Sequence, residues 1–185
     1  KARWTSGITP HTRFQALWND DFLYFAFYAE DNEIILVNSI LREQDIGQED
    51  RVELFFTTGT IDQPIIENSD SLPEYYGIEI DAKGRVLDFS AKYYRKFNSN
   101  WNMKGLEVVS YHDKNGYLIE GKISLSTLKD LDLINKNNEM SVGVFRGDFT
   151  KKSHENVRWI SWIDPETSQP DFHVSKAFGR FLLVE

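Results

Sequence analysis

Hydrophobic and polar residues alternate along the chain in short runs that clusters of turn-forming residues separate. In one run, Tyr117, Ile119 and Ile123 fall on one side of an extended chain. Glu120 and Lys122 fall on the other side. This period of two is typical of β-strands with one buried face and one exposed face. The pattern therefore predicts a protein built from antiparallel sheets.

The predicted strands follow one another closely, and polar connections at 19–21, 81–85 and 113–116 predict hairpins. Only residues 124–129 show a helical pattern. We therefore expect an all-β fold, an antiparallel β-sandwich of two sheets in a jelly-roll or immunoglobulin-like arrangement, with short accessory helices and long loops. The predicted strands cover residues 12–18, 23–29, 51–57, 76–81, 86–94, 107–112, 117–124, 140–148 and 178–184.

Three longer stretches, at about 32–50, 59–74 and 148–171, show no clear pattern and are expected to be irregular. Loops of this length in a compact fold usually carry function, so we expect the binding surface among them. A chain of 185 residues can form one sandwich with a substantial core. We therefore predict a single domain over residues 1–185.

Composition narrows the classes of partner. The net charge is -8 and no basic block could neutralise a row of phosphates, which argues against nucleic acid and anionic membranes. No apolar run approaches the length needed for membrane insertion. The absence of cysteine excludes disulfides and thiolate chemistry. Aromatic residues make up 14% of the chain, which fits a sheet protein with flat surfaces for stacking.

Five segments resemble, in the same order, the pattern of the family 9 carbohydrate-binding modules and their DOMON-type relatives. The hallmark is an acidic pair followed by a strand with a central glutamate, here Glu49, Asp50 and Glu53. The five segments are Trp18 to Phe27 with Glu30 and Asp31, Gln48 to Phe56, Tyr75 to Asp81 with Gly84 and Asp88, Gly116 to Leu128, and Arg158 to Trp162 with Phe172, His173 and 178–182.

The resemblance implies a non-catalytic module that binds plant or microbial polysaccharides, or their oligosaccharides, within polysaccharide-degrading systems. In this family two Trp rings enclose a terminal sugar, because the C–H faces of a pyranose pack on aromatic rings. The second wall maps to Trp162, with Trp159 beside it. The position of the first wall is Gly47, and Trp101, in a polar segment, is the candidate replacement.

The resemblance also implies polar contacts. Glu53 maps to a carboxylate that bonds sugar hydroxyls, and the polar pair that follows falls on Glu79 and Asp81. Arg146 ends an apolar strand, where its guanidinium could stack on a sugar and donate hydrogen bonds. The alternative for Arg146 is an ion pair with Asp148 or another carboxylate.

Structural calcium is frequent in the family, and carboxylates supply the hard oxygen ligands that calcium prefers. No acidic cluster has the spacing of an EF-hand. The candidate ligands are Asp20, Asp21, Asp31 and Asp50, with Asp45 and Glu49 nearby.

Three other functions stay open. A glycosidase needs two carboxylates across a cleft, although no Gly-x-Ser-x-Gly, phosphate-loop or dinucleotide motif occurs. A haem-binding redox domain, as in DOMON relatives, would need Met103 or Met140 with a histidine, or two of the four histidines, facing one pocket. A structural sandwich with a decayed sugar site fits Gly47. The resemblance also implies export, so we expect a secreted, periplasmic or bacterial cell-surface location, with a leader removed before Lys1.

Overall fold

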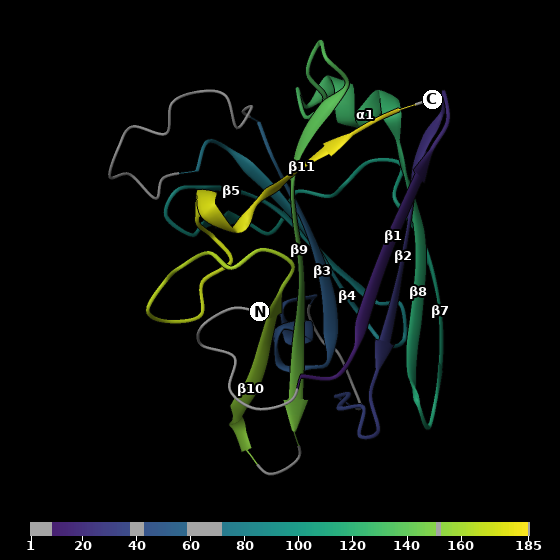
Figure 1. The fold of residues 1–185 in the computed structure, drawn as a ribbon, viewed down its shortest axis with the longest axis vertical. Coiled ribbons are helices and arrows are strands. Elements are labelled where there is room, and N and C mark those ends of the chain that lie inside the picture. The colour runs from purple at the N-terminus through teal and green to yellow at the C-terminus, as the bar shows by residue number, and fades with distance from the viewer. Residues whose placement is uncertain (1–8, 38–42, 59–71, 151–152, 185) are drawn as a thin grey trace.

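The computed structural model describes residues 9–37, 43–58, 72–150 and 153–184, which form two antiparallel sheets that face each other (Figure 1). The four-stranded sheet has the order β1 (Thr12–Trp18), β2 (Phe22–Glu30), β8 (Gly116–Ser124), β7 (Glu107–Asp113). The seven-stranded sheet has the order β10 (Ser153–Ser161), β9 (Glu139–Thr150), β3 (Arg51–Thr57), β4 (Tyr75–Asp81), β5 (Val86–Lys92), β6 (Lys96–Asn98), and β11 (Gly179–Leu182) also pairs with β9. The predicted all-β sandwich is confirmed.

Helices are accessories, as expected. They are the 3-10 helix η1 (Glu43–Gln48), the α-helix α1 (Leu125–Asp130) and the 3-10 helix η2 (Ser175–Ala177). Within the described residues, no helix has the length and hydrophobicity that a membrane crossing requires.

Two strands were not predicted. β6 is short, and β10 lies inside the stretch 148–171 that was expected to be irregular, so that expectation was wrong for β10. The start of β10 is polar, and its pairing with β9 shifts register between Ser153 and Arg158, which breaks the alternation. Most of the expected loop at 59–74 lies outside the described residues.

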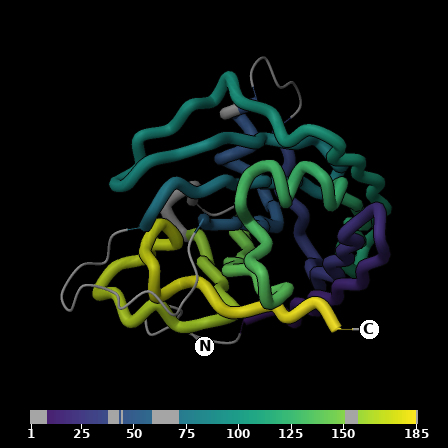
Figure 2. Tube along the Cα trace, turned by 90° about the horizontal axis from the view of Figure 1, so that it is seen from above, coloured from purple at the N-terminus to yellow at the C-terminus, as the bar shows by residue number. Residues whose placement is uncertain are grey.

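The turn between β1 and β2 shows how the sequence sets the register. The Asn19 side-chain oxygen accepts hydrogen bonds from the backbone N–H groups of Asp21 and Phe22 at 3.0 and 2.8 Å. Asn favours turns because its side chain can bond to the backbone ahead of it. At the other end of the chain, the Trp18 indole donates to the Val184 carbonyl at 2.9 Å, so the C-terminal segment ends beside β1 (Figure 2).

The main core lies between the two sheets. Alternate residues of β2 and β3 point into it, including Phe25, Phe27, Leu54 and Phe56, each at most 3% exposed. In this core, the Phe25 ring packs directly against a glycine of the neighbouring strand, Gly121. A Cβ at Gly121 of β8 would come within 2.3 Å of the Phe25 ring.

The seven-stranded sheet is also covered on its other side, here called the outer face, which points away from the four-stranded sheet. Phe55, Tyr75, Phe89 and Phe145 form a second core there with segments that follow β10. All seven residues of β3 are therefore buried. Because side chains alternate along a strand, the odd-numbered residues of β3 belong to the outer face.

Substituting Gly121 with Ala should destabilise the fold, because the new methyl group would overlap the Phe25 ring. We expect a loss of about 1–3 kcal/mol in the free energy of unfolding, the range for overpacked cores. Urea unfolding followed by Trp fluorescence measures it. Gly47→Ala is the control, since a Cβ at Gly47 meets no heavy atom within 4 Å. Equal stability of the two variants would contradict this packing.

Candidate functional site

Four of the predicted site residues lie on the outer face, and three of them, Glu53, Glu79 and Trp159, lie around Arg51. Glu53 of β3 lies opposite Glu79 of β4 in the strand register. Trp159 of β10 pairs with Gly147 of β9, and β9 in turn pairs with β3. Glu53 and Glu79 are buried, and Trp159 is partly buried against the second core. The sheet therefore brings two carboxylates and one indole ring onto one side.

One arginine serves both carboxylates. The Nε atom of Arg51 lies 2.9 Å from Glu53 Oε1 and 2.7 Å from Glu79 Oε2. These are short ion pairs, but neither contact has the angles of a hydrogen bond, so all three atoms lack a hydrogen-bond partner. Two carboxyl groups thus share one positive charge in a buried place.

This buried cluster changes the pKa of Glu53. Burial raises the pKa of Glu53 from 4.5 to about 8, and the neighbouring Glu79 carboxylate raises it further, whereas Arg51 and Arg95 act in the opposite direction. The cause is that a buried carboxylate loses the water that stabilises its charged form. Glu53 therefore retains a proton over a pH range in which an exposed glutamate has lost it.

Trp159 packs beside this cluster. Its ring lies 5.3 Å from the Arg51 guanidinium carbon and makes edge contacts with Phe149 and Phe172 at 6.2 and 5.6 Å. An arginine on an aromatic face is attracted by the ring quadrupole. Most of the indole is thus engaged by the protein itself.

The Asp81 carboxylate is fully used by hydrogen bonds within the protein. Its Oδ1 accepts the backbone N–H groups of Lys83 and Arg85, both at 2.9 Å, and its Oδ2 accepts the Arg85 Nε at 2.5 Å. Arg85 also binds Glu49 Oε2 at 2.6 Å. Asp81 thus fixes the β4–β5 turn and links it to the segment after η1. With no exposed surface, it has no area to offer a sugar.

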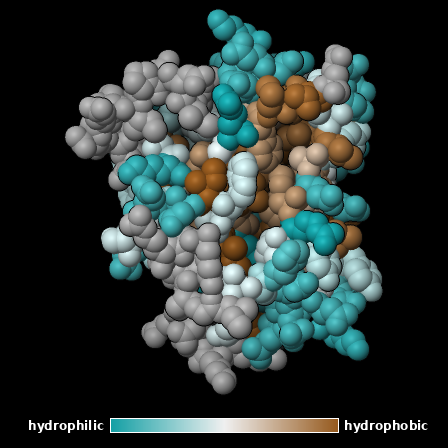
Figure 3. Space-filling model, in the orientation of Figure 1, coloured by the Kyte–Doolittle hydropathy of each residue, from teal (hydrophilic) through white to brown (hydrophobic). Residues whose placement is uncertain are grey.

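Trp162 and Trp101 lie elsewhere. Trp162, 51% exposed, lines a groove of about 970 Å³ between β1 and β11, together with Leu17 and Val184. Figure 3 shows hydrophobic side chains gathered where this groove opens. Trp101 packs on Tyr76, with ring centres 4.9 Å apart, at the border of the core between the sheets. The structure therefore does not bring Trp162, Trp101 and Glu53 together.

Arg146 also lies between the sheets and has no exposed surface. It makes ion pairs with Asp148 at 2.7 Å and with Asp31 at 3.0 Å. This placement matches the ion-pair alternative for Arg146. Arg146 also lies at the base of the groove that Trp162 lines, but it has no exposed surface there.

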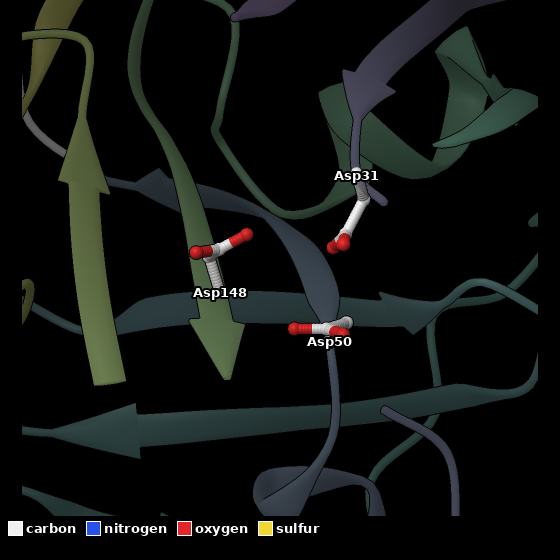
Figure 4. A group of neighbouring side chains, drawn as sticks. All are labelled: Asp31, Asp50 and Asp148. Atoms are coloured by element: carbon white, nitrogen blue, oxygen red, sulfur yellow. The ribbon is translucent and has the colours of Figure 1, made fainter. Parts of the chain in front are cut away.

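The candidate metal ligands separate into two places. Asp20 and Asp21 are exposed in the β1–β2 turn. Asp31 and Asp50 meet at the opposite end of β2, where they join Asp148 at the end of β9 (Figure 4). The three carboxylates are buried and have oxygens within 4.8 Å of one another, an arrangement that could hold a metal ion.

Aromatic and charged side chains form a rim at the edge of the outer face. We define the rim as Tyr94, Arg95, Phe97, Asp171 and His173. The Tyr94 hydroxyl donates to Asp171 Oδ2 at 2.7 Å. The Arg95 guanidinium carbon lies 5.9 and 5.7 Å from the ring centres of Tyr94 and Phe97. Tyr94 and Phe97 are 46% and 45% exposed, so the rim offers open aromatic surface.

His173 connects the rim to the second core. Its Nδ1 lies 3.0 Å from the Tyr75 hydroxyl, and its ring contacts Phe97 and Phe55, with centres 5.4 Å apart in both cases. Burial lowers the pKa of His173 to about 3, and the positive charges of Arg95 and Arg51 lower it further. The ring is therefore neutral at physiological pH.

The rim was missed in the sequence. The signal was a run made up entirely of aromatic and basic residues at 92–97, Lys-Tyr-Tyr-Arg-Lys-Phe. This run crosses from β5 into β6 through a tight turn, which places Tyr94, Arg95 and Phe97 close together. Gly47, the position of the missing first Trp, lies in η1.

The two-sheet sandwich, with aromatic and charged side chains gathered on one outer face, has the architecture of a binding module. The family described as carbohydrate family 9 binding domain-like matches residues 1–185, so the chain belongs to this family. No curated protein sequence matches it significantly.

Solved structures share the fold. One is a candidate carbohydrate-binding protein from Bacteroides uniformis, with a TM-score of 0.69 and 14% identity over 92% of this chain and 77% of that chain. A family 9 carbohydrate-binding module from Caldicellulosiruptor kristjanssonii was solved in complex with glucose and with cellotriose. The TM-scores are 0.61 and 0.60, with 16% identity over 95% of this chain and 78% or 76% of those chains.

The raised pKa of Glu53 predicts how stability depends on pH. Between pH 4.5 and about 8 the folded chain holds a proton that the unfolded chain releases. The free energy of unfolding should therefore fall as pH rises through this interval. Glu49 and Asp50, whose pKa burial raises to about 7, act in the same direction. Glu53→Gln should reduce the slope without abolishing it.

Urea unfolding across this interval measures the slope. Glu120→Gln, at an exposed position of β8, should leave the slope unchanged. His173, whose pKa burial lowers from 6.5 to about 3, acts in the opposite direction below pH 6.5. If the wild-type protein gains stability between pH 6.5 and about 8, where His173 no longer contributes, the proposed charge state of Glu53 is wrong.

Proposed function

We propose that the chain binds a neutral polysaccharide or its oligosaccharides without catalysis, and that the rim on the outer face makes the contact. The observation that supports this is the exposed aromatic surface of Tyr94 and Phe97, with the Arg95 guanidinium and the Asp171 carboxylate beside it. Sugars need this combination, because aromatic rings pack on their C–H faces while charged groups bond to their hydroxyls.

Arg95 is the central polar group of the rim. Its side chain is 45% exposed and lies 4.0 Å from the nearest Asp171 oxygen, which leaves its donors room for a ligand. Its backbone φ is 57°, a left-handed conformation that non-glycine residues adopt uncommonly and that occurs often in binding sites.

Glu53 and Glu79 lie buried on the same face as the rim. They are 2% and 8% exposed, so they do not form the open contact area. The positive charge of Arg95 acts on Glu53 and opposes the rise of its pKa, so the rim and the buried pair are electrostatically linked. We infer that the pair holds Arg51 in place and draws the Arg95 guanidinium over the outer face, where a sugar meets it.

The ligand class rests on the relatives. One family 9 module of the same fold was solved with glucose and with cellotriose, so glucan oligosaccharides are the first probes for this chain. Polysaccharides of this kind are too large to enter a cell. We therefore also propose that the module works outside the cytoplasm, in the secreted, periplasmic or surface-attached state.

Non-catalysis fits the positions of the carboxylates. Glycoside hydrolysis needs two carboxyl groups that flank a bond of the substrate across an open cleft. Glu53 and Glu79 are instead buried and share Arg51. Met103 and Met140, the methionines of a methionine–histidine haem site, are both buried in the core between the sheets.

Calcium is the proposed identity of any metal at the group Asp31, Asp50 and Asp148, because a set of carboxylate oxygens suits a hard cation of that size. An ion there would have to share Asp31 and Asp148 with Arg146. The calcium proposal therefore depends on what Arg146 does.

Tyr94→Ala should weaken binding of cellotriose about tenfold, which corresponds to about 1.4 kcal/mol, because the stacking surface is lost. Tyr94→Phe keeps the ring and should retain most of the affinity. Tyr111→Ala is the matched control, since Tyr111 is 65% exposed on the other sheet. Isothermal titration calorimetry measures all three.

Trp162→Ala tests whether the sugar binds at the rim or in the groove that Trp162 lines. Binding that survives Tyr94→Ala but is lost in Trp162→Ala would move the sugar site to the groove. A folded wild-type chain that binds no member of a glycan array would favour a sandwich with a decayed sugar site.

The wild-type chain should release no reducing ends from a panel of β-glucans and xylans, because Glu53 and Glu79, the carboxyl pair of the outer face, are only 2% and 8% exposed. A colorimetric assay of reducing sugar measures this outcome. Steady release that Glu53→Gln abolishes would overturn the non-catalytic proposal.

A further inference from the structure

Arg146 joins the two sheets from a fully buried position. Although it belongs to β9, its Nη1 donates to the Thr12 hydroxyl at 3.2 Å and its Nη2 donates to the Glu30 carbonyl at 3.0 Å. Both partners belong to the four-stranded sheet. Its guanidinium carbon also lies 5.5 Å from the ring centre of Tyr117. One cation therefore contacts groups from both layers of the sandwich.

The carboxylates of Asp31 and Asp148 direct all their oxygens at donors. Asp31 Oδ2 accepts Arg146 Nη2 at 3.0 Å, and Asp31 Oδ1 accepts the Glu33 backbone N–H at 2.8 Å. Asp148 Oδ1 accepts the same Nη2 at 2.7 Å, and Asp148 Oδ2 accepts Arg158 Nε. Two arginines and one backbone amide thus bind these four oxygens.

Asp50 completes the group. Its Oδ1 accepts the Phe149 backbone N–H at 2.5 Å, and its Oδ2 accepts the Ile35 backbone N–H. All six oxygens of the three carboxylates therefore have a donor from the protein.

This arrangement differs from a calcium site. Calcium takes six to eight oxygen ligands at about 2.3–2.6 Å, and each ligand directs a lone pair at the ion. Here the lone pairs of Asp31 and Asp148 that face the middle of the group are directed at Arg146. The group does not fit a metal ion while that guanidinium is in place.

We infer that Arg146 is a built-in counter-ion that takes the place of a structural metal at the Asp31–Asp50–Asp148 group. The module then folds without calcium, unlike what its family resemblance implies. Removing the Arg146 guanidinium leaves three buried carboxylates, the Glu30 carbonyl and the Thr12 hydroxyl facing the space that it filled, with Arg158 still paired with Asp148 at one side. Such a set of oxygens suits calcium, so the variant should acquire a calcium site.

The inference is independent of the sugar site, because Arg146 lies between the sheets and the rim lies on the outer face. Its test is therefore a measurement of stability. The midpoint of thermal unfolding should be the same for the wild-type protein in EDTA and in millimolar CaCl₂. For Arg146→Ala in EDTA, we expect the midpoint to fall by about 10 °C, because buried carboxylates lose their partner. Millimolar CaCl₂ should restore part of the loss.

Two controls make the test specific. Arg146→Lys keeps a positive charge and should show no calcium response. Arg146→Ala combined with Asp50→Asn removes a ligand and should lose the response of the single variant. Equal concentrations of MgCl₂ and NaCl identify a general effect of salt on an acidic chain.

Two outcomes would overturn the inference. One is a wild-type protein whose unfolding midpoint drops when EDTA removes a bound ion. The other is a folded Arg146→Ala variant that calcium does not stabilise. If Arg146→Ala does not fold in either buffer, the wild-type measurement and Arg146→Lys still decide the first point.

Discussion

Strand β3 is buried on both faces, and this constraint decides where the polar side chains of the sandwich can lie. One face of β3 supplies the apolar core between the sheets. The other carries Arg51 and Glu53 under the segments that cover the outer face. A charge in such a place needs a partner, because burial removes its water. Among the described residues, exposed aromatic and charged side chains gather at the edge of this face, in the rim.

Two arginines on opposite faces of the seven-stranded sheet each provide the positive charge that buried carboxylates require. Arg51 serves Glu53 and Glu79 on the outer face, and Arg146 serves Asp31 and Asp148 between the sheets. In both places the carboxylates outnumber the arginine that links them. Replacing such clusters by apolar residues is often neutral or stabilising, so they are weak evidence for stability. Their positions suggest different roles, one beside the ligand surface and one between the layers.

The sequence predicted most of the fold, because period-two alternation marks strands with one buried face. The strands around Phe27 and Ile119 belong to this kind. β10 was not predicted, because its polar start and its register shift interrupt the alternation of hydrophobic and polar residues. Because β10 was not predicted, the sequence could not show on which faces its two Trp side chains lie. Trp159 and Trp162 are three positions apart, so an extended chain places them on opposite faces, and only the structure showed that the chain is extended there.

Other parts of the site depend on contacts that no local pattern encodes. Trp101 follows a polar segment and could be read as exposed, yet it packs on Tyr76. Asp148 joins Asp31 and Asp50 from a distant strand end. The pairing of Tyr94 with Asp171 likewise links positions 77 residues apart, and such a contact becomes visible only when the outer face is assembled.

A crystal structure of the chain with bound cellotriose tests the central claim most directly, because it locates the sugar without relying on any substitution. The account predicts density for a sugar ring stacked against Tyr94 or Phe97, with a hydroxyl bonded to Arg95 or Asp171. A sugar seated on Trp162 in the groove beside β1, with the rim empty, would contradict it.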